Sequence, residues 1–224
     1  MAKKKNEPVR TTIEDVNDSL STAAKRLEDN KKYIYWALYA VIGIMILVAV
    51  YIYGIRTPNL QKARELVGKA DLELIQGDTV NALKDYQKVI DAYSNKPAQR
   101  ARLSAATILY GQGKYKEAAA YLEKYDPKGE MAGPASQSLL GDCYVNMKQL
   151  DKAVSTFDKA ISLAKDNEYY KPTFMLKKAT VLHAQKKYDQ EIKIYEDIRD
   201  NYHEFQQIYQ FNPDKYIERA KGSK

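Results

Sequence analysis

Hydrophobic residues form one long uninterrupted run near the start of the chain, KKYIYWALYAVIGIMILVAVYIYGIR at residues 31–56. From Tyr33 to Ile55 there are 23 residues without a charge. A helix of that length covers about 34 Å, enough to cross the hydrocarbon core of a bilayer. Tyrosines and the only tryptophan, Trp36, lie near its ends, where aromatic rings prefer the membrane-water interface. The pattern predicts a transmembrane helix over residues 33–55.

The flanks of this run predict that it is retained and oriented. A cleavable signal peptide has a shorter apolar core and a small-residue cleavage site, whereas here 32 residues precede the run. We therefore expect an uncleaved signal anchor. Residues 1–32 carry eight Lys and Arg, including Lys31 and Lys32 beside the span, which favours a cytoplasmic N-terminus. The expectation is a single-pass protein of the bacterial inner membrane with a periplasmic C-terminal domain.

Apolar positions in the cytoplasmic segment 1–32 follow a helical period instead. Thr11 or Thr12 is the expected N-cap, with Glu14 or Asp15 completing a capping box. The spacing of three and four residues places one narrow apolar stripe on this short amphipathic helix, formed by Ile13, Val16, Leu20, Ala23 and Leu27. Two interpretations remain open: a helix lying on lipid, or a partner-binding or homo-oligomer seam through residues 12–28.

After the span, Pro58 is expected to end one helix and start the next, and the remaining sequence repeats. The aligned segments are GDTVNALKDYQKVIDAY (77–93), GKYKEAAAYLEKY (113–125), KQLDKAVSTFDKAISLA (148–164) and KKYDQEIKIYEDIRDNY (186–202). Their equivalent positions are Ala82, Ala118, Ala153 and Glu191, followed four residues later by Tyr86, Leu122, Phe157 and Tyr195. Upstream of each turn a second small residue recurs at Ala70, Ala106, Gly141 and Ala179. Two helices per repeat, crossing where side chains are small, explain this period of 36, 35 and 38 residues.

These residues resemble the tetratricopeptide repeat, a helix-turn-helix unit of about 34 residues. In LLGDCYVNMKQLDKAVSTFDKAI (139–161) the family's positions are filled by Gly141, Tyr144, Ala153, Phe157 and Ala160. The resemblance implies an all-α fold, in which an α-solenoid over residues 57–203 holds about four repeats, at about 60–96, 99–126, 134–168 and 172–203. Glu73 and Glu191 depart from the family pattern in the first and last repeats. A capping helix and tail over 204–224 follow, with Asn212 as N-cap and Pro213 in the first turn.

Composition narrows the chemistry. The net charge is +7, yet residues 57–224 interleave both signs, so we expect no nucleic-acid partner. Cys143 is the single cysteine and is expected to be a small buried hydrophobe, and the two histidines form no cluster at metal-ligand spacing. GQGK (111–114) is interpreted as a turn, not a phosphate loop. We expect no enzymatic activity, no metal and no cofactor. The segment DPKGEMAGP (126–134) is either a hinge or an ordinary longer loop.

The resemblance further implies that the first helix of each repeat lines a concave groove that binds segments of other proteins. The residues expected to face this groove are Asp71, Leu74, Arg100, Leu103, Thr107, Tyr110, Asp142, Val145, Asn146, Leu176, Thr180 and His183. The set lacks the Lys and Asn arrangement with which some family members hold a C-terminal carboxylate.

The order of cytoplasmic helix, span and repeats is similar to that of the ancillary subunit of the bacterial Sec translocon. That resemblance implies an adaptor at the periplasmic face of the inner membrane, with translocon components, periplasmic chaperones or secreted clients as partners and the lipid bilayer contacted through 33–55. The alternatives are a scaffold for envelope assembly or cell division, an organelle-surface import receptor with cytosolic repeats, and a homo-oligomeric structural protein.

Overall fold

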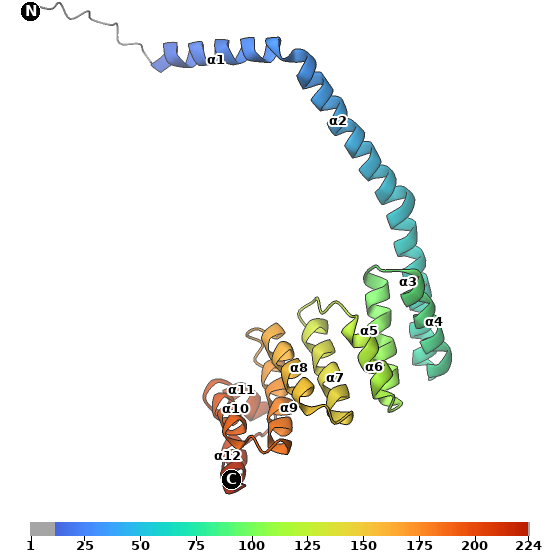
Figure 1. Ribbon diagram of the computed structural model, residues 1–224, viewed down its shortest axis with the longest axis vertical. Coiled ribbons are helices and arrows are strands. Elements are labelled where there is room, and N and C mark those ends of the chain that lie inside the picture. Colours follow the sequence, from blue (N-terminus) through green and yellow to red (C-terminus); the bar gives the residue numbers. More distant parts are fainter. Residues whose placement is uncertain (1–11, 224) are drawn as a thin grey trace, which may run out of the picture. The chain divides into compact units, whose positions relative to one another are not determined.

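The computed structural model describes residues 12–223, with side chains from residue 16 onward. All regular elements in this part of the chain are helices, which confirms the expected all-α class (Figure 1). The chain divides into two compact units, Met1–Pro58 and Asn59–Lys224. The basic residues Lys3, Lys4, Lys5 and Arg10, and the side chains of the expected capping box at residues 11–15, lie outside the described part.

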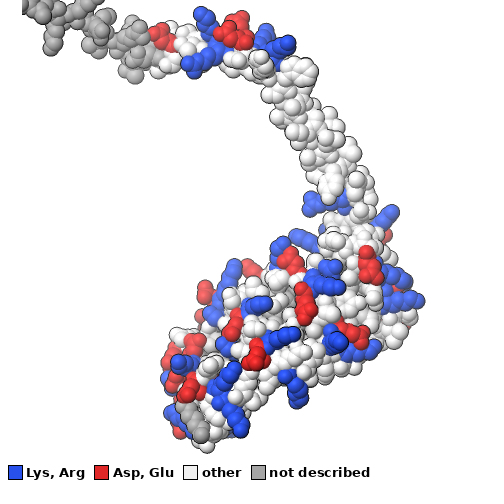
Figure 2. Space-filling model, viewed as in Figure 1, with Lys and Arg blue, Asp and Glu red and all other residues white. Residues whose placement is uncertain are grey.

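The first unit consists of helices α1 (Thr12–Asp29) and α2 (Lys31–Val50) and the π-helix η1 (Tyr51–Arg56). It contains a helical segment that is long and apolar enough to cross a membrane. None of the residues of α2 is buried, and its uncharged run is the white stretch in Figure 2. On α1, Val16, Leu20 and Leu27 are all more than half exposed. The apolar faces of both helices are thus open to their surroundings.

The backbone stays helical at Pro58, so the prediction that this proline ends a helix was wrong. Residues Tyr51–Arg56 have π-helical hydrogen bonds, and α3 (Thr57–Ile75) begins directly after them. Both the backbone N–H and the Oγ1 of Thr57 donate to the carbonyl of Ile52, the latter at 2.8 Å. Pro58 lies in the first turn of α3, where its missing N–H is tolerated.

The second unit is a row of helical hairpins, which Figure 1 shows following one another in chain order. After α3 come α4 (Thr79–Ala92), α5 (Lys96–Gly111), α6 (Tyr115–Glu123), α7 (Ala132–Asn146), α8 (Leu150–Leu163), α9 (Tyr170–Ala184), α10 (Tyr188–Asn201), α11 (His203–Ile208) and α12 (Pro213–Gly222). Each helix from α4 to α10 packs against the next, and α10 also packs against α12. We call α3, α5, α7 and α9 the first helices.

The repeat positions aligned from sequence form the interior of this row. The small residues Ala70, Ala106, Gly141, Ala179, Ala82, Ala118 and Ala153 are all buried, and so are Glu191, Tyr86, Leu122, Phe157 and Tyr195. A Cβ built on Gly141 would lie 2.6 Å from the Phe157 ring. The helices of this hairpin approach so closely at the crossing that only glycine fits there.

Turns between paired helices recur in the same register. The residues with positive φ are Gly77, Gly113, Lys148 and Lys186, which occupy equivalent positions in the four aligned segments. Glycine adopts this conformation without a steric cost, whereas lysine adopts it under mild strain. The turn geometry is therefore a property of the repeat and does not depend on glycine.

The C-terminal end of the row closes with α11 and α12. Asn212 accepts a hydrogen bond from the N–H of Asp214 at 3.1 Å, and Pro213 occupies the first turn, as the sequence predicted. The short helix α11 was not predicted. The loop before α7 packs tightly on the start of that helix. A Cβ built on Gly133, in the first turn of α7, would lie 2.5 Å from the carbonyl oxygen of Pro127 in this loop.

Candidate functional site

All the residues expected to face the groove lie on the first helices. Side chains of this set connect each first helix to the next. Arg100 of α5 bonds to Asp71 of α3 at 2.5 Å, and Asn146 of α7 lies 3.5 Å from the hydroxyl of Tyr110 on α5. The structure thus brings residues from neighbouring first helices together on one surface, which we call the first-helix face.

A third connection on this face joins α7 to α9. The Lys177 ammonium lies 2.5 Å from Asp142 and donates to Ser138 at 3.0 Å. Burial raises the pKa of the Asp142 carboxyl, while the hydrogen bond from Lys177 opposes that rise. The middle of the first-helix face is therefore polar and internally paired.

Asp71 also connects the first-helix face to the core. The Tyr86 hydroxyl of α4 donates to its Oδ1 at 2.5 Å. Burial, and next the hydrogen bond to Asp71, raise the pKa of Tyr86 to about 12. This phenol stays protonated at neutral pH and holds Asp71 in position for Arg100.

An apolar hollow of about 460 Å³ lies toward the end of α3 and α5. It is lined by the predicted residues Leu74, Leu103 and Thr107, together with Thr79, Ser104, Ile108, Gly111 and Gln112. We call it the apolar hollow. Its neighbours along the chain include three large exposed side chains, Leu72, Ile75 and Val80, which are 60%, 81% and 73% exposed.

A second hollow of about 380 Å³ lies against α9. We call it the aromatic hollow. It is lined by the predicted residues Leu176 and Thr180 with Thr173, Lys177, Phe205, Tyr209 and Phe211. The rings of Phe205 and Tyr209 lie 4.7 Å apart between centroids. The sequence did not predict these aromatic residues as part of the site, because they belong to α11 and the loop that follows.

The remaining predicted residues contribute to packing within the row. Val145 is partly buried against the core around Phe157. His183 contacts the second helix of its own hairpin, with Nδ1 2.9 Å from Glu191 of α10. Glu191 is completely buried and also accepts from Arg219 of α12 at 3.0 Å. His183 therefore participates in closing the C-terminal end of the row.

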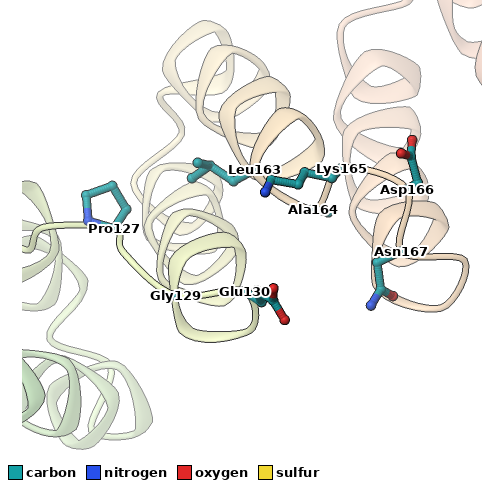
Figure 3. Close-up of a pocket in the computed structure, with 8 residues that line it drawn as sticks. All are labelled: Pro127, Gly129, Glu130, Leu163, Ala164, Lys165, Asp166 and Asn167. Carbon is teal, nitrogen blue, oxygen red and sulfur yellow. The ribbon is translucent and has the colours of Figure 1, made fainter.

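A further hollow lies away from the predicted residues. Its volume is about 500 Å³, and Figure 3 shows its walls: Pro127, Gly129 and Glu130 from the loop before α7, and residues 163–167 from the end of α8 and the turn before α9. The Asn167 amide oxygen already accepts from the N–H groups of Tyr169 and Tyr170.

Reactive chemistry has little support on these surfaces. Cys143 is fully buried, as expected, and burial raises the pKa of its thiol to about 11. A nucleophilic cysteine needs the thiolate, which that environment disfavours at neutral pH. Among the side chains that the structure describes, from residue 16 to residue 223, no group of three His, Cys, Asp or Glu is placed to hold a metal ion.

Stacked helical hairpins with connected first helices define an α-solenoid. Two family models, both described as tetratricopeptide repeat, match residues 67–133 and 109–179. This part of the chain consists of tetratricopeptide repeats, and such repeats indicate an adaptor for protein-protein interaction.

Solved structures agree on the fold. The crystal structure of MamA protein superposes with a TM-score of 0.54 at 19% identity, covering 72% of this chain and 87% of that one. A kinesin light chain from Podosopora anserina with nearly identical TPR-like repeats gives a TM-score of 0.53 at 16% identity, covering 86% and 95%. At such identities these likenesses concern the fold alone.

A curated relative, Protein CTR9 homolog of Arabidopsis thaliana, is 34% identical over 105 residues. The match covers 45% of this chain and 9% of that protein. The chain thus spans about a tenth of the length of the curated relative it matches.

Proposed function

We propose that this protein is a non-enzymatic, membrane-tethered adaptor whose repeat domain binds segments of other proteins on its first-helix face. The observation that carries the proposal is the presence of two hollows on that face, both lined by side chains that the repeat register assigns to a groove. Apolar hollows with a few polar groups at their rims suit individual side chains of a partner. The proposed repeats are those at about 60–96, 99–126, 134–168 and 172–203, with a cap over 204–224.

The tether is residues 33–55. Support comes from the length and apolar character of the helical segment and from the absence of burial along α2. A helix that is apolar on all sides and lacks a protein partner is stable in lipid. Lys31 and Lys32 favour a cytoplasmic N-terminus, which places the repeats in the periplasm of a bacterial cell.

In that location the adaptor assists protein translocation or the trafficking of envelope proteins. Its partners are translocon components, periplasmic chaperones or secreted clients. The surface of the repeat domain visible in Figure 2 mixes both signs of charge, as expected for a domain that binds proteins transiently in water. The order of span and repeats along the chain agrees with this role, and it agrees equally with the alternative of a scaffold for envelope assembly or cell division.

Site-specific photo-crosslinking tests the proposed surface. A photo-reactive phenylalanine at Leu103 or Thr180 is expected to form adducts with other proteins in cells. The matched positions Lys116 and Lys159 are exposed on the second helices α6 and α8 and are expected to form none. Equal adduct yields from all four positions would contradict a role for the first-helix face.

Membrane orientation has its own test. In a Cys143→Ser background, a cysteine introduced at the exposed Ser223 is expected to react with a membrane-impermeant maleimide in intact spheroplasts of a Gram-negative host. Protection of Ser223→Cys until the membrane is lysed would place the repeats in the cytoplasm and favour the import-receptor alternative.

A further inference from the structure

A cationic hollow of about 350 Å³ lies on the same pair of helices as the apolar hollow. Its lining residues are Arg64, Val67 and Gly68 of α3 with Lys96, Pro97 and Arg100 of α5. Three of these six residues are cationic and none is acidic. The site combines positive charge with a small apolar floor formed by Val67 and Pro97.

Two of the three cations are available for a ligand. Arg100 is paired with Asp71, whereas Arg64 and Lys96 have no carboxylate within 4 Å among the described residues. A concave surface with uncompensated positive charge attracts an anion. The N-terminus of α5 contributes little to this attraction, because few of its backbone N–H groups are free to bind an anion. The N–H of Ala98 already donates to the Asn95 side chain, and Pro97 has no N–H.

The cationic and apolar hollows lie one after the other along α3 and α5, and we call the surface that carries both of them the α3–α5 groove. On α3 the lining residues step from Arg64 and Val67 to Leu74, and on α5 from Lys96 to Leu103 and Thr107. These spacings of three, four and seven residues keep each set on one side of its helix. Seven residues of helix cover about 10 Å. Arg100 lines the cationic hollow, and its partner Asp71 lies on α3 between Val67 and Leu74.

We infer that this groove binds an extended protein segment that places an acidic side chain in the cationic hollow and an apolar side chain in the apolar hollow. About 10 Å is the length of about three residues of extended chain. Side chains that point to the same side of an extended segment are two or four residues apart. The recognised pattern is therefore an acidic residue separated by one or three residues from an aliphatic one. This inference rests on the proposed peptide-binding role and gives it a partner chemistry.

The groove favours a peptide over a lipid headgroup. A phospholipid phosphate would occupy the cationic hollow alone. The apolar hollow, about 10 Å further along, carries Ser104, Thr107 and Gln112 at its walls. The Thr107 hydroxyl already donates to the carbonyl of Leu103, but its oxygen can still accept from a peptide N–H, and the Gln112 amide can bond to a peptide backbone, whereas an acyl chain has no group to meet them.

Fluorescence anisotropy with the full chain in nonionic detergent tests the inference. The probes are labelled peptides with acetyl and amide ends, so that they carry no terminal carboxylate, containing Glu-x-Leu or Glu-x-x-x-Leu in both chain directions. We expect replacement of the peptide Glu by Gln to weaken binding about three- to tenfold, the effect of two exposed ion pairs. Replacement of the peptide Leu by Ser is expected to weaken it to a similar extent.

Protein variants assign the effects to the two hollows. The Arg64→Gln/Lys96→Gln variant should bind the Glu and Gln peptides equally but still prefer Leu over Ser. Leu103→Asn should bind the Leu and Ser peptides equally but still prefer Glu over Gln. The matched control, Lys116→Gln/Lys159→Gln, removes the same charge from second helices and should behave like the unmodified protein.

The outcomes separate this inference from the function on which it rests. Equal affinity for Glu and Gln peptides with a retained Leu preference would overturn the acidic specificity and leave the adaptor role intact. A lack of binding by every peptide would count against both. If only the retention of phosphatidylglycerol, measured by native mass spectrometry, falls in Arg64→Gln/Lys96→Gln, the hollow is a lipid site and the inference is wrong.

Discussion

The hairpin of α7 and α8 and the hairpin of α9 and α10 fill the same repeat position in opposite ways. In the first, Ala153 is buried near the crossing of Gly141 and Phe157. In the second, the equivalent residue is Glu191, which is equally buried but carries a charge. Burying an unpaired carboxylate is costly, so the second hairpin needs partners that the first does not.

One of those partners lies within the hairpin, and the other comes from the end of the row. Arg219 of α12 and His183 of α9 both reach the Glu191 carboxylate, at 3.0 and 2.9 Å. In a hairpin inside the row, which further hairpins cover, a small apolar residue fills this position. The last hairpin is covered by the short helices α11 and α12, and the bond between Arg219 and the buried Glu191 selects where α12 docks. The comparison indicates that the departure from the repeat pattern at Glu191 is a docking device for the cap.

The steepest loss of stability is expected where the packing is entirely apolar. Phe157→Ala should lower the free energy of unfolding by about 3–5 kcal/mol, because it empties a fully buried ring site. Gly141→Ala should cost about 1–3 kcal/mol, because its Cβ meets that ring. Urea unfolding of the full chain in detergent, followed by circular dichroism, measures both. Lys159→Ala, an exposed change on α8, is the control.

A Phe157→Leu background sharpens this prediction. Leucine withdraws the atoms nearest Gly141, so Gly141→Ala should cost less there than in the unmodified chain. An identical cost in both backgrounds would show that Gly141 is retained for a reason other than the close contact.

At the last hairpin the expected cost is smaller and depends on Glu191. Arg219→Met should lower the free energy of unfolding by about 1–3 kcal/mol, because it leaves a buried carboxylate with only His183. Glu191→Ala restores the family residue and removes that carboxylate. In the Glu191→Ala background, Arg219→Met should therefore change stability by less than about 0.5 kcal/mol. An undiminished cost in that background would mean that Arg219 acts through Tyr216, whose ring lies 5.1 Å from it.

Much of the fold could be predicted because each repeat is local in sequence. The small and aromatic positions are set by helices that are neighbours in the chain, and the structure buries them all. Asn212 and Pro213 carry their signal within one turn. The continuation of the helix at Pro58 could not be predicted from the sequence, because it depends on a shift to π-helical hydrogen bonding at Thr57.

The site was less predictable because its shape depends on side chains from distant positions. Arg219 lies 28 residues beyond Glu191, and no periodicity connects them. The helix α11 has six residues, too few for an apolar stripe to stand out. The cationic hollow was missed for a similar reason, because Arg64 and Lys96 meet only when α3 packs beside α5.

The hairpin of α3 and α4 is intermediate between the apolar interior around Phe157 and the buried carboxylate of Glu191. Here a nearly buried carboxylate is paired with exposed lysines. Asp85 lies 2.6 Å from both Lys69 and Lys88, and hydrogen bonds from Lys69 and then Lys88 hold its pKa below the usual value. Asp85→Asn should cost about 1 kcal/mol at neutral pH.

The pH dependence of that cost follows from the sign of the shift. Because the folded pKa of Asp85 is lower than the unfolded one, its contribution is present above about pH 4 and is lost as the pH falls through the folded pKa. The difference between the unmodified chain and Asp85→Asn in urea unfolding should thus shrink between about pH 7 and about pH 3. A difference that stays constant over this range would show that the ion pairs contribute nothing and that the amide merely packs less well.

Chemical labelling of Cys143 reports on the opening of the hairpin formed by α7 and α8. Burial raises the pKa of Cys143 to about 11 and seals it beside Phe157 and Tyr144 in the central core. A thiol reagent at about pH 8 should therefore label the native chain only when this hairpin opens. Phe157→Ala should accelerate labelling strongly, while Arg219→Met should leave its rate nearly unchanged, because repeats contact only their neighbours. Acceleration by both variants would mean that the row opens as one unit and that the two hairpins, despite their different interiors, share one cooperative transition.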